Sequence, residues 1–334
     1  MVLAVSCATV APPLGSGATP SATASATNGS RPSASASPSA PSPTVSFEVV
    51  ATIPVGARPF YMAATTDAVW VANSGSGTVS RIDPRSNTVV ATIAVGSLTD
   101  TLFGSPTAVA TDGSAVWVAK SAEHAIARID PASNRLTTTI PLAVEPYAVA
   151  VNGDDLWVTS FRSNQLLRMS ASTGRVLATI AIPAPTTVAA DADGVWVVAN
   201  RDDALFRIEP STNRIAVRIS VGSGIDRPET VAIGPGAVWV TLTYGDQLLR
   251  IDPKTNVVVA HTAVARQAFG VTAAGDVVFV ASGSGVVSAI DAATGGVLAT
   301  SPVTGQPLTT GFANGAVWVA SQDAGTVTRL RLRR

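Results

Sequence analysis

Seven charged or aromatic side chains precede short apolar runs at matching places along the chain, and their chemistry suits the binding of a small molecule. Arginine can hold a carboxylate or a phosphate through two parallel hydrogen bonds, and tyrosine offers an apolar face with a polar edge. The predicted ligand-binding residues are Arg58, Tyr61, Glu145, Tyr147, Arg227, Glu229 and Arg266. A small polar or anionic ligand, such as a glycan or the end of a peptide, fits this set.

The apolar runs that must position these side chains form a repeat. Every tryptophan of the chain closes such a run, and a phenylalanine takes this place once; the positions are Trp70, Trp117, Trp157, Trp196, Trp239, Phe279 and Trp318. A period of roughly 40 residues is typical of a propeller blade. Because the runs around these residues are apolar at successive positions, we expect both faces of each strand to be buried, with the aromatic ring as a wedge between neighbouring blades.

One unit of the repeat, residues 106–143, contains four short runs separated by turn signals, the pattern of an antiparallel meander. The turn before its last run begins with Asp-Pro and ends with Asn, and every copy ends on Asn or Gly, the residues that best tolerate the left-handed backbone conformation. These closing residues are Asn87, Asn134, Gly174, Asn213, Asn256 and Gly295. The repeat therefore predicts four-stranded blades.

The two ends of the repeat predict how the ring closes. The last unit, which begins near Gln306, stops before a fourth run, whereas residues 49–56 (VVATIPVG) match residues 89–96 (VVATIAVG) of the first unit almost letter by letter. The N-terminal segment should therefore supply the outer strand of the last blade and leave no open sheet edge. The fold class is all-β, a seven-bladed β-propeller over residues 45–334.

An arginine follows each of the six tryptophans at a fixed interval, at Arg81, Arg128, Arg168, Arg207, Arg250 and Arg329. We interpret these arginines as structural, since a functional residue is not normally needed in every blade. Their aliphatic stems should pack between blades while the guanidinium groups reach backbone carbonyls or the aspartate of the turn.

In such a ring, the segments that lead into the innermost strands share one face with the loops between second and third strands. That face is the default ligand site. The seven predicted residues should surround the opening of the channel there, with outer contacts from Lys120, Arg162, Asn200, Arg201, Tyr244, Asp246 and Asp323. The alternative is that these charges simply pair with one another across a water-filled channel mouth.

The N-terminal part has a different composition. Residues 8–44 are almost entirely Ala, Ser, Thr, Pro and Gly, which predicts a disordered linker. The preceding residues 1–7 end in Leu-Ala-Val-Ser-Cys and resemble the lipobox of a bacterial lipoprotein signal, with Cys7 as the lipidated residue. We expect Met1 to be an internal residue of a longer signal peptide, of which residues 1–7 are a remnant. The alternative is a chance cysteine before a flexible leader. We expect an exported protein, anchored to the outer face of the cytoplasmic membrane or secreted.

Residues 69–96 (VWVANSGSGTVSRIDPRSNTVVATIAVG) resemble the YVTN-type, or YncE-like, bacterial seven-bladed propellers, and the similarity extends over essentially all of residues 45–334. More distantly the repeat resembles virginiamycin B lyase. The first resemblance implies an exported or surface-bound propeller, and the second implies metal-assisted elimination with histidines and a glutamate around the channel. This chain has only His124 and His261, and a metal site usually needs three or four ligands.

These observations favour a binding module over an enzyme. The formal net charge is zero, which argues against a nucleic-acid partner, and the chain has no nucleophile elbow or credible histidine–acid pair. We expect a monomer that binds a small ligand or a protein partner at the cell surface, without a cofactor or a metal. The alternatives are a metal-dependent lyase or lactone hydrolase, and a purely structural scaffold.

Overall fold

The computed structural model describes residues 45–96 and 104–334. The predicted signal remnant with Cys7 and the predicted linker 8–44 lie outside the described residues. The chain divides into two units, Met1–Ser42 and Pro43–Arg334, and the second unit contains all of the described residues.

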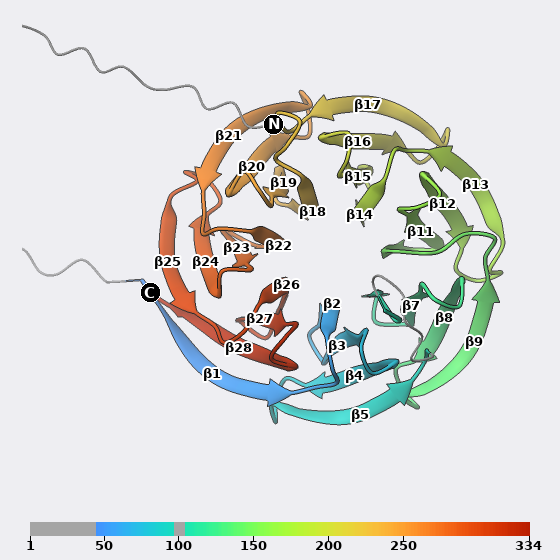
Figure 1. The fold of residues 1–334 in the computed structure, drawn as a ribbon, viewed down its shortest axis with the longest axis horizontal. Coiled ribbons are helices and arrows are strands. Elements are labelled where there is room, and N and C mark those ends of the chain that lie inside the picture. Colours follow the sequence, from blue (N-terminus) through green and yellow to red (C-terminus); the bar gives the residue numbers. More distant parts are fainter. Residues whose placement is uncertain (1–44, 97–103) are drawn as a thin grey trace, which may run out of the picture. The chain divides into compact units, whose positions relative to one another are not determined.

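The described residues form strands arranged as seven four-stranded sheets around a ring, so the predicted propeller is confirmed (Figure 1). The innermost strands of blades 1 to 7 are β2 (Pro59–Thr65), β6 (Ala108–Thr111), β10 (Val149–Asn152), β14 (Pro185–Ala190), β18 (Pro228–Gly234), β22 (Ala268–Ala274) and β26 (Pro307–Ala313). The second strands are β3 (Ala68–Asn73), β7 (Val116–Lys120), β11 (Asp155–Ser160), β15 (Val195–Ala199), β19 (Ala237–Leu242), β23 (Val277–Ser282) and β27 (Ala316–Ser321).

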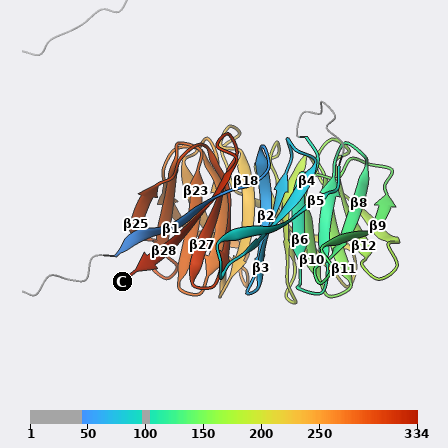
Figure 2. The same ribbon diagram turned by 90° about the horizontal axis from the view of Figure 1, so that it is seen from below.

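The third strands are β4 (Thr78–Asp83), β8 (Ala125–Asp130), β12 (Gln165–Ser170), β16 (Ala204–Glu209), β20 (Gln247–Asp252), β24 (Val286–Asp291) and β28 (Thr326–Arg333). The outer strands are β5 (Thr88–Ala94), β9 (Arg135–Pro141), β13 (Val176–Ala181), β17 (Arg214–Ser220), β21 (Val257–Ala263) and β25 (Val297–Pro302), with β1 (Ser46–Pro54) in blade 7. Seen from the side, the strands run between the two faces of the ring (Figure 2).

Ring closure follows the predicted exchange. The sheet of blade 7 has the order β1-β28-β27-β26, and β1 pairs antiparallel with β28, for example Phe47 with Leu332 and Thr52 with Thr328. Since the first strand of the fold completes the last blade, neither β1 nor β28 leaves an open edge toward its neighbour.

The repeated aromatic residues lie between blades, as predicted. Trp70 is 1 % exposed and packs with Val116 and Val118 of blade 2, while Trp318 is fully buried against Met62 and Val69 of blade 1. Apolar side chains from two neighbouring blades enclose each of these rings. The core is therefore a set of inter-blade layers, each fastened by one aromatic wedge.

The six arginines that follow the tryptophans at a fixed interval stack on those tryptophans, with guanidinium carbons 4.9 to 5.9 Å from the ring centroids. Arg81 also donates from Nη1 to the carbonyl oxygen of Pro131 and to Oδ1 of Asn134, both at 2.7 Å, in the turn of the next blade. The predicted contact with carbonyl groups is confirmed, but the second acceptor is the asparagine of the turn and not its aspartate.

The turn aspartates serve their own turns instead. Oδ1 of Asp83 accepts the backbone N–H of Arg85 at 2.8 Å, and Oδ1 of Asp130 accepts that of Ala132 at 2.9 Å. All six closing residues have positive φ, from 56° at Asn134 to 74° at Gly295, so the predicted left-handed position is confirmed.

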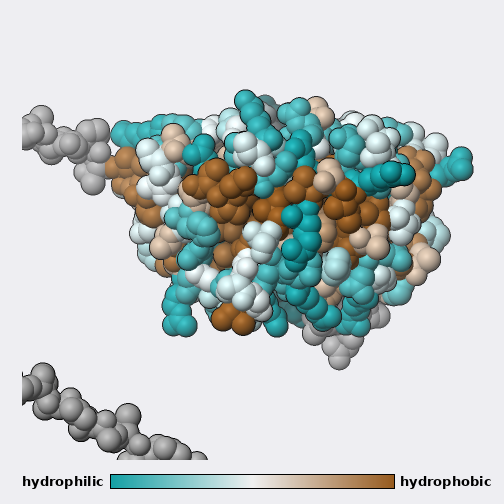
Figure 3. All heavy atoms as spheres, turned by 90° about the horizontal axis from the view of Figure 1, so that it is seen from above, coloured by the Kyte–Doolittle hydropathy of each residue, from teal (hydrophilic) through white to brown (hydrophobic). Residues whose placement is uncertain are grey.

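The outer wall of the ring is partly apolar. Figure 3 shows apolar side chains gathered in a band on one side of it, and the outer strands expose Val49, Val90, Leu136, Val176, Leu177, Ile215, Val257, Val259 and Val297. Among the described residues, no helix is long and apolar enough to cross a membrane.

Candidate functional site

A cavity of about 350 Å³ opens on the face where the leads into the innermost strands meet the loops between second and third strands. It spans blades 3 to 6, and its lining comes from those leads and loops and from the second residues of three innermost strands: Tyr147, Phe161, Thr186, Asn200, Arg201, Arg227, Glu229, Thr243, Tyr244 and Phe269. A smaller apolar cavity of about 60 Å³ shares Glu229 and Phe269 and is completed by Phe60, Tyr61, Thr230 and Leu308. The two cavities together define the channel-mouth site.

Glu229, the second residue of β18, lies at the centre of this site because it lines both cavities. Nδ2 of Asn200, in the loop after β15, donates to Oε2 of Glu229 at 2.9 Å and to the carbonyl oxygen of Pro228 at 3.0 Å. The hydroxyl groups of Thr186 and Thr187 donate to the backbone carbonyl of Glu229 at 3.1 and 2.8 Å. Blade 4 therefore fixes the start of β18 and orients the carboxyl group of Glu229 toward the channel.

The pKa of the Glu229 carboxyl group is raised from its ordinary value of 4.5 to about 7. Burial among protein atoms is the main cause, and it outweighs the hydrogen bond from Asn200, the positive charge of Arg227 and the interactions with Tyr147 and Tyr61, which all lower the pKa. The residue remains partly exposed to solvent, because its side chain faces the two cavities. Glu229 can thus change its protonation state near neutral pH.

Aromatic side chains of blades 1 and 3 meet beside this carboxyl group. The ring of Tyr61 from blade 1 lies 6.2 Å from that of Tyr147 from blade 3, nearly perpendicular to it, and Phe60 contacts both edge to face. Burial raises the pKa of both tyrosines well above the ordinary value, and the charge of Glu229 adds to this effect. Both phenols therefore stay protonated and remain hydrogen-bond donors in the channel.

Two arginines stand at the wider part of the site. Arg201 stacks over Phe161 with its guanidinium carbon 4.8 Å from the ring centroid, and Arg227 stacks over Tyr244 at 5.5 Å. Stacking holds the planar guanidinium groups by their faces and leaves their N–H edges to bind an acceptor. The site thus combines an enclosed carboxyl group, stacked cations and aromatic walls.

The structure brings together four of the seven predicted residues, Tyr61, Tyr147, Arg227 and Glu229. The other three lie on the same face but do not line either cavity. Glu145 forms an ion pair with Arg162 at 3.3 Å, while Arg58 packs against Gly75, and Arg266 accepts the backbone N–H of Ser284 through its carbonyl group at 3.3 Å.

The predicted outer contacts divide in the same way. Asn200, Arg201 and Tyr244 line the larger cavity. Asp246 accepts the backbone N–H of Gln267 at 2.8 Å, and Asp323 accepts that of Gln306, so both aspartates stabilise loops. Lys120 is buried, and Arg162 pairs with Glu145.

Sequence reasoning missed Phe60, Phe161 and Phe269 as lining residues. Phe60 and Phe269 are the second residues of β2 and β22, so their position in the repeat was the available signal. Phe161 follows β11 in a loop of the same face, and its contacts with Tyr147, at 6.0 Å between ring centroids, and with Arg201 show its role.

The two histidines lie apart from this site. His261 is exposed on β21, with Nδ1 2.9 Å from Oε1 of Gln247, and His124 is exposed in the loop after β7. In the part of the chain that the structure describes, no three His, Cys, Asp or Glu side chains gather as a metal site would require.

The fold and this site define a seven-bladed β-propeller with a ligand-sized cavity at one mouth of its channel. Residues 246–333 match the model of a family described as outer membrane protein assembly factor BamB. The structure is similar to that of Kuenenia stuttgartiensis hydrazine synthase, with a TM-score of 0.72 and 14 % identity over 82 % of this chain and 95 % of that chain. At this identity the likeness shows the fold alone. No curated protein matches the chain.

Proposed function

We propose that this protein is an exported propeller of the YVTN type, anchored by a lipid at Cys7, whose channel-mouth site binds a small polar or anionic ligand. The observation that carries the proposal is the cavity of about 350 Å³ in which Arg201 and Arg227 are stacked on aromatic rings beside the enclosed Glu229. A cavity of this size suits a sugar or the end of a peptide.

The chemistry of the lining supports a ligand with both flat apolar surface and polar groups. Phe161 and Phe269 offer apolar surface, Arg227 and Arg201 offer donors to a carboxylate, and Glu229 can accept or donate a hydrogen bond, depending on pH. Because Asn200 and the tyrosines already engage Glu229, the carboxyl group is oriented before a ligand arrives.

The match of residues 246–333 supports a role in protein interaction as well, since the matching family is named for an outer membrane protein assembly factor. The same name is in keeping with an exported protein. In this version of the proposal, the occupant of the channel-mouth site is the end of a partner polypeptide, and the propeller presents the site at the cell surface.

The test is a thermal unfolding scan of the full chain with a panel of cell-wall sugars, short peptides and small carboxylates. A ligand present at about 100 times its dissociation constant should stabilise the fold by about 2.7 kcal/mol. Replacing Arg227→Ala should remove the shift that any one compound produces, whereas the matched change Arg266→Ala, outside both cavities, should keep it. A shift that survives Arg227→Ala and Glu229→Gln would contradict the assignment of the site.

The lipid anchor is tested separately. The variant Cys7→Ser should move the protein from the membrane fraction of cells into the soluble fraction, since a thiol is required for lipidation. An unchanged distribution between the two fractions would rule out Cys7 as the anchor and would leave the channel-mouth site untouched.

A further inference from the structure

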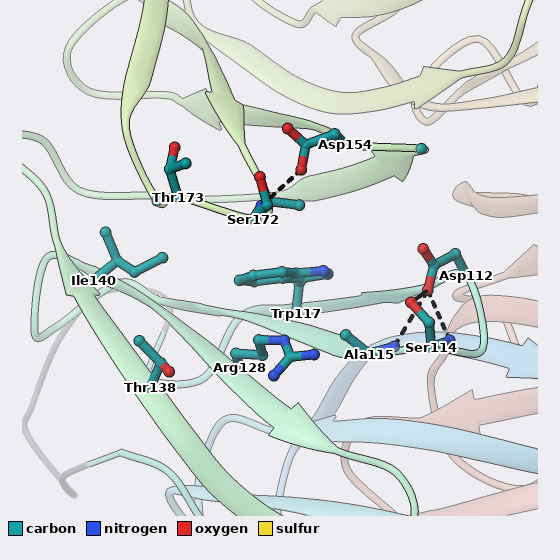
Figure 4. Close-up of a pocket in the computed structure, with 13 residues that line it drawn as sticks. Asp112, Ser114, Ala115, Trp117, Arg128, Thr138, Ile140, Asp154, Ser172 and Thr173 are labelled. Carbon is teal, nitrogen blue, oxygen red and sulfur yellow. Dashed lines mark hydrogen bonds between the residues drawn. The ribbon is translucent and has the colours of Figure 1, made fainter.

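Carboxyl groups occupy two kinds of surroundings in this fold. The first kind lies on the face opposite the channel mouth, and Figure 4 shows two examples at the junction between blades 2 and 3. Asp112 accepts the backbone N–H of Ser114 at 2.8 Å, and Asp154 accepts that of Ser172 at 2.7 Å. Hydrogen bonds from the hydroxyl group of Ser170 and from Ser172 lower the pKa of Asp154. This carboxylate is therefore already supplied with donors and stays ionised at neutral pH.

A cleft of about 590 Å³ lies beside Arg128 at this junction, but it is not peculiar to it. Clefts of about 560 and 530 Å³ lie beside two other arginines of the same series. What differs is the turn that faces Arg128, which has Ala171 and Gly174 where four of the six turns have proline and asparagine. In residues 45–96 and 104–334, Arg128 donates no hydrogen bond to this turn. The space is thus a general feature of the blade junctions and marks no ligand site of its own.

Glu229 at the channel mouth has the second kind of surroundings. Its Oε2 accepts a hydrogen bond from Asn200 at 2.9 Å, and the phenols of Tyr61 and Tyr147 also hydrogen-bond to its carboxyl group. These donors do not offset its burial, so its pKa is about 7. In the part of the chain that the structure describes, Arg227 is stacked on an aromatic ring and forms no ion pair with this carboxyl group. The group is therefore oriented by hydrogen bonds but has no cation bound to it.

The larger cavity of the channel mouth places an anionic ligand beside this carboxyl group. Arg201 and Arg227 line the cavity, and their stacking on Phe161 and Tyr244 leaves their N–H edges to bind an acceptor. Glu229 lines the same cavity of about 350 Å³. A carboxylate held by the two guanidinium groups therefore shares a small, partly enclosed space with the carboxyl group of Glu229. Two carboxylates in such a space do not both ionise readily, so one proton is retained between them.

We infer that the channel-mouth site binds small carboxylic acids together with one proton, which Glu229 carries and donates as a hydrogen bond to the carboxylate of the ligand. Such proton-linked binding rests on the proposed function of the site and specifies its class of ligand. When Glu229 is ionised in the free protein, solvent supplies the proton as the ligand binds. Binding is therefore strong while the carboxyl group is protonated and weakens as the pH rises above about 7.

Glu229 is the group in this site that can carry the proton. Arg201 and Arg227 remain cations at any pH at which the protein is folded. Burial keeps the pKa of Tyr61 and Tyr147 well above neutral. The other residues that face the two cavities from neighbouring strands and loops carry amide, hydroxyl or hydrocarbon groups: Asn200, Thr186, Thr230, Thr243, Tyr244, Phe60, Phe161, Phe269 and Leu308.

Two further carboxylates on the same face have other partners. Glu145 pairs with Arg162 at 3.3 Å. Oδ1 of Asp203 accepts the backbone N–H of Arg227 at 3.2 Å and so fixes the segment that leads into β18. Neither carboxylate lines either cavity. Glu145 is therefore a matched control for Glu229, since it carries the same chemical group on the same face but outside the site.

The shape of the site favours an acid with a short apolar group. The smaller cavity, of about 60 Å³, is lined mainly by Phe60, Phe269 and Leu308 and meets the larger one at Glu229. A ligand whose carboxylate is held by the two arginines can therefore extend a few carbon atoms toward this apolar space. An inorganic anion would leave the space unfilled. Butyrate is accordingly the probe, and inorganic phosphate is the comparison.

The test is isothermal titration calorimetry of the full chain with butyrate at pH 6 and pH 8, each in two buffers of different ionisation enthalpy. The dissociation constant should rise about tenfold from pH 6 to pH 8, because the protonated fraction of Glu229 falls about tenfold over this range. The difference between the buffers should show uptake of nearly one proton at pH 8 and almost none at pH 6. The variant Glu145→Gln should give both results unchanged.

Two variants separate the proton from the rest of the site. Glu229→Gln replaces the carboxyl group with an amide that can donate a hydrogen bond at every pH. This variant should bind butyrate equally at pH 6 and pH 8, as tightly as the unaltered chain does at pH 6, and without proton uptake. Arg227→Ala removes a cation that holds the carboxylate, so it should weaken binding at least tenfold at both pH values.

The outcomes distinguish this inference from the proposed function. Butyrate binding that is independent of pH, or that takes up no proton at pH 8, would overturn the proton-linked binding and leave the proposed function intact. Equal binding of inorganic phosphate would overturn the class of ligand. If butyrate did not bind at pH 6, the carboxylic acid class would be wrong, and the thermal unfolding scan with sugars and peptides would decide independently whether the site binds any ligand.

Discussion

Glu229 at the channel mouth and Arg128 between blades 2 and 3 are both half-buried charged side chains beside aromatic rings, but their surroundings differ. Asn200, Arg227, Tyr147 and Tyr61 all interact with Glu229, whereas Arg128 stacks on Trp117 and lies near the charge of Asp130. Glu229 occupies a position at which the blades differ from one another. Arg128 occupies a position that the blades share, and its neighbour has changed. Glu229 thus differs from its counterparts by its own identity, whereas Arg128 differs from Arg81 by the turn that faces it.

The largest expected effect compares Arg128 with Arg81. Replacing Arg81→Met should lower the free energy of unfolding by about 2 to 4 kcal/mol, because it removes two charge-assisted hydrogen bonds and leaves the oxygens of Pro131 and Asn134 without their donor. Replacing Arg128→Met should cost about 1 kcal/mol or less, the value of stacking on Trp117 alone. Urea unfolding of both variants measures the difference, and equal losses would mean that Arg128 has partners of similar strength.

The second prediction concerns how the protonation of Glu229 makes the stability of the protein depend on pH. Because its folded-state pKa of about 7 lies above the ordinary value of 4.5, the folded protein holds the proton more tightly than the unfolded chain does. Its contribution to stability is therefore present at low pH and is lost as the pH rises from about 4.5 to about 7. The loss should amount to about 1 to 3 kcal/mol, since one pKa unit corresponds to about 1.4 kcal/mol and water in the cavity reduces the effect.

The variant Glu229→Gln isolates this contribution, since it keeps the shape and removes the titration. The difference in unfolding free energy between the unaltered chain and the variant should fall as the pH rises from 5 to 8 and stay constant above pH 8. Parallel stability curves over this range would show that the carboxyl group ionises in the folded protein as it does in water.

The sequence predicted the ring itself because the repeat encodes it redundantly. One tryptophan or phenylalanine marks each second strand, and turns that end on Asn or Gly precede six of the outer strands. Residues 49–56 repeat residues 89–96 and so predict the closing strand. Each of these signals is local, so no contact between distant residues was needed to find them. The structure confirms the pairing of β1 with β28 and the left-handed residue that ends each turn.

The sites were harder to predict because they depend on contacts between blades. Asn87, Asn134, Gly174 and their counterparts look equivalent in the sequence, since asparagine and glycine both tolerate positive φ. The structure shows that the asparagine has a second task, as acceptor for the arginine of the preceding blade. Likewise, the approach of Tyr61 to Tyr147 across the channel depends on the diameter of the closed ring, which no short motif encodes.

The third prediction separates these two tasks of asparagine. The change Asn134→Gly retains the left-handed turn, with a φ of 56°, but removes the acceptor for Arg81. It should cost about 1 to 2 kcal/mol, the sum of one charge-assisted hydrogen bond and the added freedom of glycine in the unfolded chain. In the background of Arg81→Met, most of the loss should disappear. An equal loss in both backgrounds would assign the whole effect to the turn.

The smallest effect runs in the opposite direction. The double change Ala171→Pro and Gly174→Asn should stabilise the junction between blades 2 and 3 by about 0.5 to 1 kcal/mol, because it supplies an acceptor to Arg128 and restricts the unfolded chain. The gain is limited because a Cβ at residue 174 would lie 3.0 Å from Cδ1 of Ile140, which must shift slightly. When Arg128→Met is added, the part of the gain due to the new hydrogen bond should vanish, and only the part due to the stiffer turn should remain. If the gain were the same with and without Arg128, the missing acceptors would not be the reason that this junction differs from its neighbours.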